Sequence, residues 1–308
     1  MKLHKVLEHE FEGVPPYSFV LTVHKPAGWD WLTPFEKFDG GTIWTGMRAL
    51  DRVIGIRAES LGSVERPRIR TVVYSDDVLT NEEEGVILEK LAFCLRLDED
   101  ISEFYALVED DPLIKQVRDD LFGMRDTPYP DIFTGSILAI ALQWASIKRS
   151  MEMREAVYRE YGDALNFEGK RIILSPSPHR IALEDARDLK DRCHLGYRAT
   201  HIKSVAEAIV SGDVPTMEEL AKMPPGEAKK ELLKLKGIGD YSADIISPHR
   251  GFPVDVWSAK IFAKILGIGG DDTRGLIREV KTLAKERFGE WAGYVFVYVL
   301  NDLDRVHQ

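Results

Sequence analysis

The sequence predicts an α+β protein, in which an N-terminal antiparallel sheet module precedes two mostly α-helical lobes. Three observations support this fold class. Short runs rich in β-branched and aromatic residues, bounded by Gly, Pro and Asp, fill the first 75 residues. From about residue 81 the apolar residues recur at helical spacing. The 308 residues, 44% of them hydrophobic, suffice for a buried core. We therefore expect a β module over 1–80 and a helical region over 81–308.

Four strands are expected in the β module, and everything after it is expected to be helical. The strands cover 17–24, 41–47, 52–58 and 68–74. The helices cover 82–97, 101–109, 114–122, 131–161, 182–193, 199–211, 216–222, 226–235, 242–247, 256–266, 273–288 and 292–306.

The net charge of −10 argues, taken alone, against a nucleic-acid partner, because phosphate binding draws on clustered Lys and Arg. The acidity is concentrated, however, in residues 76–120, which contain fifteen acidic and four basic residues. The rest of the chain is close to neutral, so a locally basic surface elsewhere is compatible with the composition.

Cysteine content and hydropathy exclude several other classes. Cys94 and Cys193 are too few for a disulfide framework, a four-Cys zinc site or a four-Cys iron–sulfur cluster. No run approaches the ~18 apolar residues of a membrane span, and the first residues lack the apolar core of a secretory signal. We expect an intracellular, cytoplasmic protein with no membrane partner.

The most informative stretch covers 226–247, where a helix, a Lys236-Gly237-Ile238-Gly239 turn and a second helix predict a helix-hairpin-helix. The glycines remove side chains where the backbone turns tightly. Free N–H groups at the start of the second helix can donate to a phosphate oxygen without a net basic charge. The alternative is a plain corner between two helices, with Ile238 in the core. Because a carboxylate loop follows, we favour a turn that binds DNA.

That loop covers 248–256 and places Asp255 directly before an apolar helix. A helix N-cap alone explains an aspartate at this position. A carboxylate held there also stays ionised, and cleavage of an N-glycosidic bond makes the sugar cationic, which a fixed anion stabilises. The same group can orient or deprotonate a water molecule. We predict that Asp255 is catalytic.

These motifs resemble the helix-hairpin-helix (HhH-GPD) DNA glycosylases of base-excision repair. The glycine-rich turn followed by Pro253-Val254-Asp255 is the defining pattern of that superfamily. The segments LGYRA (195–199) and FGEWAGY (288–294) resemble its 3-methyladenine DNA glycosylase II and 8-oxoguanine DNA glycosylase branches. The similarity covers most of 130–305, and the N-terminal strands fit the sheet module of both branches.

The resemblance also implies how the reaction proceeds. Bifunctional members carry a Lys nucleophile two positions after the second glycine, where this sequence has Tyr241. The resemblance therefore implies a monofunctional enzyme that uses water. Tyr241 is expected to line the base pocket and to lie near DNA, and hairpin packing is its alternative role.

Other site residues follow from the same alignment. Gln143 and Trp144 match the place where the family fills the gap left by a flipped nucleotide, although a Trp in a helix is also an ordinary core residue. Trp144, Tyr294 and Phe296 are expected in the base pocket, though the spacing of the last two also suits a buried helix face. The 8-oxoguanine branch reads its base with a Gln at the position of Phe296, which favours an alkylated purine here. His249, Lys236 and Lys260 are candidate DNA contacts.

The sequence thus predicts a monomeric glycosylase that flips a damaged base, expected to be a modified purine, out of double-stranded DNA and hydrolyses its N-glycosidic bond. In a prokaryote it would be associated with the nucleoid. No cofactor is expected, although the resemblance implies that carbonyls of Leu233, Leu235 and Ile238 can hold a structural Na⁺ or K⁺. The alternatives are a bifunctional oxidised-purine glycosylase/lyase and a non-enzymatic helix-hairpin-helix DNA-binding protein.

Overall fold

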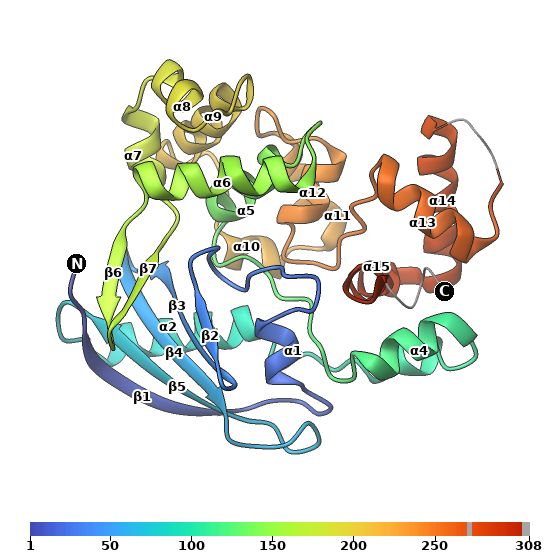
Figure 1. Ribbon diagram of the computed structural model, residues 1–308, viewed down its shortest axis with the longest axis horizontal. Helices are drawn as coiled ribbons and strands as arrows, with labels where there is room; N and C mark the ends of the chain where they lie inside the picture. Colours follow the sequence, from blue (N-terminus) through green and yellow to red (C-terminus); the bar gives the residue numbers. More distant parts are fainter. Residues whose placement is uncertain (270–272, 304–308) are drawn as a thin grey trace.

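The computed structural model describes residues 1–269 and 273–303. Five antiparallel strands form one sheet in the order β1-β5-β4-β3-β2 (Figure 1). The strands are β1 His4–Glu12, β2 Lys37–Asp39, β3 Thr42–Ala49, β4 Arg52–Ser60 and β5 Arg68–Ser75. The strands predicted over 41–47, 52–58 and 68–74 are confirmed as β3, β4 and β5, and the α+β class is confirmed with them.

The strand predicted over 17–24 is wrong, because this segment forms the short helix α1 (Phe19–Val23). Its β-branched and aromatic residues suit either structure, and the N-cap decides: the Ser18 hydroxyl accepts a hydrogen bond from the Leu21 backbone N–H at 3.4 Å. The helix buries Phe19 and Val23 in the core of the sheet module. The sheet gains β1 instead, an edge strand whose charged side chains alternate with partly buried ones.

The prediction that everything after residue 81 is helical is also wrong at one place. Strands β6 (Ala164–Phe167) and β7 (Lys170–Ile173) form a hairpin. Its turn is Glu168-Gly169, and both residues have positive φ angles, as a two-residue β-hairpin turn requires. Leu165, Phe167 and Ile172 cover one face of the five-stranded sheet. Helix α2 (Asn81–Leu95) covers the opposite face through Ile87 and Leu91.

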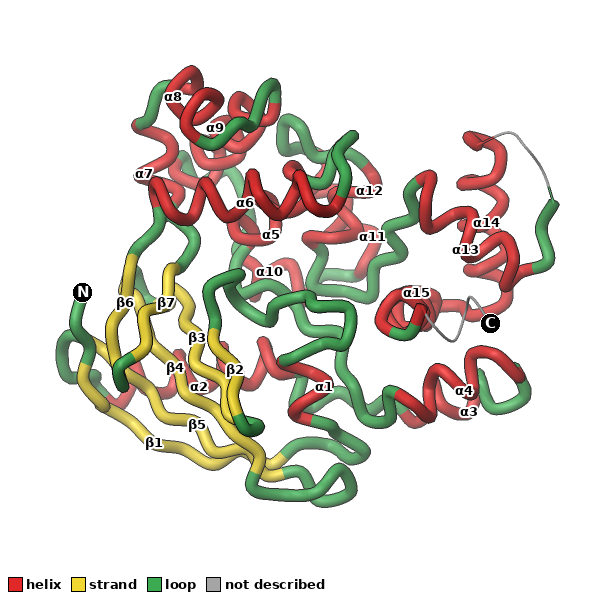
Figure 2. The backbone as a smooth tube through the Cα atoms, viewed as in Figure 1, coloured by secondary structure: helices red, strands yellow, loops and turns green. Residues whose placement is uncertain are grey.

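The helices form two lobes with separate cores (Figure 2). One lobe contains α5 Ile132–Ala141, α6 Ile147–Tyr161, α7 Pro178–Leu183, α8 Ala186–Arg192, α9 Arg198–Val210, α10 Met217–Lys222, α11 Pro225–Leu233 and α12 Asp240–Ile246. The other joins α3 Ser102–Leu107 and α4 Pro112–Asp120 to α13 Val256–Leu266, α14 Thr273–Phe288, the 3₁₀ turn Gly289–Trp291 and α15 Ala292–Asn301. The second lobe is therefore built from two segments far apart in the sequence. A domain boundary at residue 80 stays a prediction, since α2 lies beyond it yet packs on the sheet.

The helix predicted over 131–161 is two helices. Every residue of α5 is buried, so it is the central helix of its lobe. The chain then turns at Trp144, whose φ is +51°, and Ser146 caps α6 by accepting a hydrogen bond from the Arg149 N–H at 3.3 Å. The spacing of the residues in this turn is also compatible with one continuous helix, so the spacing alone did not reveal the break.

Two smaller differences concern the chain ends and the short helices. The helix predicted over 182–193 is shared between α7 and α8, because Asp185 caps α8 through the Arg187 N–H at 2.7 Å. The last helix ends at Asn301 rather than at 306, and residues 304–306 lie outside the described range. Among the helices in the described ranges, none has the length and apolar character needed to cross a bilayer.

Candidate active site

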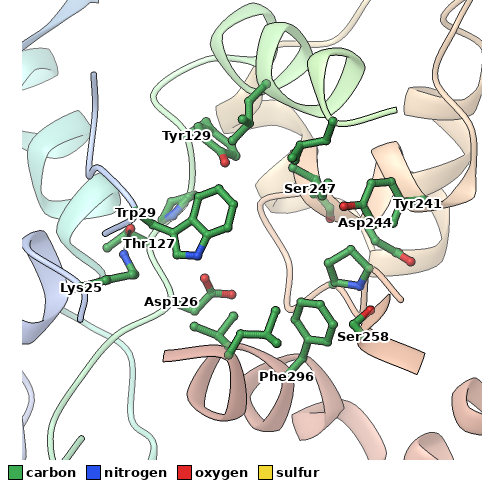
Figure 3. Close-up of a pocket in the computed structure, with 18 of the residues that line it drawn as sticks. Lys25, Trp29, Asp126, Thr127, Tyr129, Tyr241, Asp244, Ser247, Ser258 and Phe296 are labelled. Carbon is green, nitrogen blue, oxygen red and sulfur yellow. Dashed lines mark hydrogen bonds between the residues drawn. The ribbon is translucent and has the colours of Figure 1, made fainter. Parts of the chain in front are cut away.

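The two lobes and the sheet module meet at a cavity of about 220 Å³ (Figure 3). This volume is several times the ~30 Å³ share of one water molecule in the liquid, a space on the scale of a heteroaromatic base. The cavity is lined by the loop that follows α1, the loop that precedes α5, the helix α12, the loop that leads to α13 and the inner face of α15. Segments from all three parts of the fold therefore converge on one site.

Asp255 lines this cavity and is the N-cap of α13. Its Oδ1 atom accepts hydrogen bonds from the Ser258 N–H at 2.8 Å and from the Ser258 hydroxyl at 2.7 Å. Within the described part of the chain, Oδ2 accepts no hydrogen bond and neither oxygen joins an ion pair. One oxygen thus caps the helix while the other is available to the cavity, so the capping role and a chemical role coexist.

Four carboxylates line the cavity, and two of them are neutralised. Asp30 forms a bidentate ion pair with Arg154, with both N···O distances 2.7 Å. Asp244 pairs with Lys229 at 2.6 Å and with Lys281 at 3.2 Å. For Asp126 and Asp255 the described residues supply no ion-pair partner within 4.0 Å. These two are the carboxylates free to act on a bound molecule.

Tyr241, on α12, lines the cavity as expected. Burial raises the pKa of its hydroxyl, and the nearby negative charge of Asp255 raises it further. The Tyr241 hydroxyl is therefore uncharged, and it lies close enough to Asp255 for the charge of that carboxylate to affect its pKa. A lysine nucleophile at this position would face the same carboxylate, and this chain has none there.

The three predicted pocket residues other than Tyr241 have different outcomes. Phe296, on α15, lines the cavity as expected and stacks against Phe262. Tyr294 does not line it: its ring is fully buried and its hydroxyl donates to the Glu99 carboxylate. Tyr294 lies two residues before Phe296, which corresponds to a rotation of about 200° around the helix axis. The two side chains therefore point in nearly opposite directions, and the side chain of Tyr294 faces away from the cavity.

Trp144 is likewise not a pocket residue, because it lies in the turn between α5 and α6 with 93% of its surface exposed. Neighbouring Gln143 is partly buried, and its Nε2 donates to the Gly237 carbonyl at 2.7 Å and to the Ser242 hydroxyl at 3.1 Å. The Gln143 amide therefore holds the hairpin turn in place. Of the two residues predicted at the gap in DNA, Trp144 is the one that projects into solvent.

The hairpin itself has the expected form. Gly237 has a φ of +91°, and a Cβ atom there would lie 2.5 Å from the Cγ atom of His201, so the turn needs glycine. Ile238 is buried, whereas Lys236 and Gly239 are exposed. Gly239 is the N-cap of α12 and has no side chain to occupy the first N–H groups of that helix. The contact of these residues with DNA stays a prediction.

The remaining predicted contacts differ in exposure. The His249 Nε2 atom lies 3.1 Å from the Leu220 carbonyl oxygen, and the residue also lines the cavity. Lys260 is exposed on α13. At the predicted cation site, the Leu235 carbonyl accepts a hydrogen bond from the Ile238 N–H at 3.0 Å. No group of three or more His, Cys, Asp or Glu residues in the described ranges is arranged to hold a metal ion.

The loop that carries Asp255 is held from behind by an ionic and aromatic network. The Arg250 guanidinium lies 3.5 Å from the centre of the Trp291 ring, and its Nε donates to Glu99 at 3.2 Å. Glu99 also accepts the hydrogen bond from Tyr294. Part of the acidic segment 76–120 is therefore structural, and Tyr294 positions the loop indirectly.

Sequence reasoning missed a whole wall of the cavity, formed by Lys25, Trp29, Asp126, Thr127 and Tyr129. Figure 3 shows the Trp29 ring and the Asp126 carboxylate extending into the space between the lobes. These residues lie in two loops without a motif, more than 120 residues before Asp255. The only signal in the sequence was two short runs in which polar and aromatic residues stand beside Pro or Gly, HKPAGWDW (24–31) and RDTPY (125–129).

Comparison with known proteins agrees with this geometry. No family model matches the chain. A DNA-3-methyladenine glycosylase of Bacillus subtilis is 27% identical over 209 residues, which cover 66% of this chain and 67% of that protein. A probable N-glycosylase/DNA lyase of Methanothermobacter thermautotrophicus is 28% identical over 249 residues, covering 71% and 78%. The solved structure of a 3-methyladenine DNA glycosylase from Archaeoglobus fulgidus superposes with a TM-score of 0.74 at 20% identity, covering 95% and 97% of the two chains.

The fold, the hairpin and the capped aspartate beside a cavity define a helix-hairpin-helix DNA glycosylase. The chain is similar in sequence to two proteins named as DNA glycosylases, in agreement with the resemblance of its motifs to the HhH-GPD superfamily.

Proposed function

We propose that this DNA glycosylase removes a modified purine from double-stranded DNA by hydrolysis of the N-glycosidic bond, with Asp255 as the catalytic carboxylate. The observation that carries the proposal is the geometry of Asp255. Its Oδ1 is fixed by two hydrogen bonds from Ser258, and its Oδ2 remains available beside a base-sized cavity.

The reaction follows from that geometry. As the base departs with the bonding electrons, positive charge develops on the deoxyribose, and the fixed carboxylate stabilises it. A water molecule then attacks C1′ and loses a proton, for which Asp255 is the available base. The products are a free base and an abasic site, and the phosphodiester backbone stays intact.

Two observations support a monofunctional reaction. Tyr241 occupies the position at which the resembled bifunctional enzymes carry a lysine. Among the described residues, Lys25 is the one lysine that lines the cavity, and its Nζ donates to the Thr22 carbonyl at 3.0 Å and to the Thr127 hydroxyl at 2.9 Å. These bonds hold the amine in the wall, away from an attacking position.

The second candidate is a glycosylase with lyase activity, and the printed name of the Methanothermobacter relative favours it. Burial lowers the pKa of Lys25, which is a known way to activate an amine. If a lysine forms a Schiff base here, Lys25 is the residue to test. The non-enzymatic alternative predicts DNA binding without any base release.

The test uses duplex oligonucleotides that contain 7-methylguanine, hypoxanthine, 8-oxoguanine, uracil or ethenoadenine. We expect release of at least one modified purine, strand breaks only after alkali, and no protein–DNA adduct when borohydride is present. An adduct that forms in the wild type and disappears in Lys25→Ala identifies the lyase. Intact glycosidic bonds on every duplex, despite tight binding, contradict an enzymatic function.

Trp144 provides a further prediction. We expect Trp144→Ala to slow base release by about 10-fold or more, because a side chain that fills the vacated stack offsets a few kcal/mol of unstacking. The thermal midpoint should not change, because the side chain is almost fully exposed. Leu183→Ala is the matched control: Leu183 is 89% exposed on α7 and does not line the cavity. Equal rates for the wild type and Trp144→Ala would remove Trp144 from the reaction.

Other aspects of the proposal concern the setting of the reaction. We propose that the protein acts as a monomer on the DNA inside the cell. We also propose that the N–H groups of the hairpin donate hydrogen bonds to a DNA phosphate. A monovalent cation at the carbonyls of Leu233, Leu235 and Ile238 would strengthen that contact by adding positive charge next to the phosphate.

A further inference from the structure

A second free carboxylate, Asp126, lies on the cavity wall formed by the loop before α5. Its backbone carbonyl accepts a hydrogen bond from the Arg96 Nε at 3.1 Å, which anchors the residue. The side chain is different, because no donor in the described ranges is within hydrogen-bonding distance of its carboxylate. A partly buried carboxylate with an anchored backbone and no partner is a feature that needs an explanation.

Burial and the surrounding charges have opposite effects on the ionisation of Asp126. Burial raises the pKa of this carboxyl group, while the positive charges of Arg96 and Lys25 act in the opposite direction. Asp126 in turn raises the pKa of Lys25, which burial lowers. Burial has the larger effect and keeps the pKa of Asp126 above its usual range, whereas Arg96 and Lys25 favour the ionised form without bonding to its oxygens. An ionised carboxylate only accepts hydrogen bonds.

The position of Asp126 separates it from the catalytic group. Figure 3 shows Asp126 and Ser258 on opposite sides of the Phe296 ring, with the Trp29 ring above Asp126. Ser258 is bonded directly to Asp255. A nucleoside whose sugar lies at Asp255 would therefore extend its base toward Asp126, between aromatic rings that can stack on it.

We propose that Asp126 is the specificity-determining residue of the cavity and accepts hydrogen bonds from N–H groups on the Watson–Crick edge of the everted base. This inference rests on the proposed function. A guanine-type edge presents N1–H beside the 2-amino group, two parallel donors that match the two oxygens of a carboxylate. An adenine-type edge presents the lone pair of N1, which the carboxylate repels. The cavity therefore selects lesions derived from guanine over lesions derived from adenine.

The experiment compares Asp126→Asn with the wild type on duplexes that carry 7-methylguanine, 8-oxoguanine or ethenoadenine. Loss of hydrogen bonds to a charged group should slow release of the guanine-type base that the wild type prefers by about 10- to 100-fold. Release of ethenoadenine should change less than about 3-fold, because it does not present those donors. Asp126→Glu, which keeps the charge, should recover part of the guanine-type activity.

Asp131→Asn is the matched control, since Asp131 lies in the same loop, caps α5 and does not line the cavity. An equal loss on every base in Asp126→Asn, or no loss on any, overturns the inference. Binding to duplexes with the same bases on 2′-fluorinated sugars, which resist hydrolysis, provides an independent readout. If the wild type releases no base, the proposed function fails, while a guanine-selective loss of binding in Asp126→Asn still supports the role of Asp126.

Discussion

Asp255→Asn is expected to reduce base release by at least ~10²-fold, because it removes the anion that stabilises the cationic sugar. The side chain keeps its shape, and asparagine is also a good N-cap, so α13 and the cavity should persist. Affinity for duplex DNA should stay within a few-fold of the wild type. Single-turnover release of the preferred base and a binding titration measure the two effects separately.

Asp185→Asn is the control for this prediction. Asp185 also caps a helix with its Oδ1 atom, at 2.7 Å from the Arg187 N–H, and it is exposed on α8 and absent from the cavity lining. The same loss of charge there should leave base release unchanged. Normal turnover by Asp255→Asn would reject the role assigned to Asp255, whatever its stability.

Gly237→Ala is expected to distort the hairpin and to weaken DNA binding by about 10-fold or more. A residue other than glycine at a φ of +91° costs about 1–3 kcal/mol of folding free energy. The new Cβ would also meet the His201 ring at 2.5 Å, so the turn must shift. Thermal or denaturant unfolding and duplex affinity should both report the change.

Gly239→Ala is the control for Gly237→Ala. It tests whether the loss comes from the backbone conformation and steric clash at residue 237, or from replacing any glycine of the turn. Gly239 has a φ of −100°, and a Cβ atom there would meet no atom within 4 Å. Its cost should be that of a poorer N-cap, below about 1 kcal/mol. If the two alanine variants lose equal stability, the steric explanation for Gly237 is incorrect.

Sequence patterns predicted those strands and helices in which one signal dominates. Strands β3, β4 and β5 follow runs of β-branched residues, and α13 follows an aspartate N-cap and an apolar stripe. The segment 17–24 carries β-branched residues too, yet a serine cap and burial of Phe19 in the sheet module make it a helix. The hairpin 164–173 has strands of only four residues, which are too short for a periodic signal.

The site shows the same division. Asp255 and Tyr241 were predicted because a motif places each of them at a stated distance from the glycine turn, and Phe296 was predicted from the alignment of the last helix with the family. Tyr294 and Trp144 were assigned to the pocket from the same alignment, but helical rotation turns one into the core and the α5–α6 turn exposes the other. The spacing of residues along the chain does not determine which face of a helix or turn is directed toward a cavity.

The order of amino acids alone therefore established the class of protein, the hairpin turn and the carboxylate that follows it, because these features depend on local backbone conformation and capping. The wall that contains Trp29, Lys25 and Asp126 depends on contacts between segments more than 30 residues apart. The same is true of the pairing of Asp30 with Arg154 and of Asp244 with Lys281. Such contacts arise when separate apolar faces pack into common cores, and packing, unlike capping, leaves no fixed spacing in the chain.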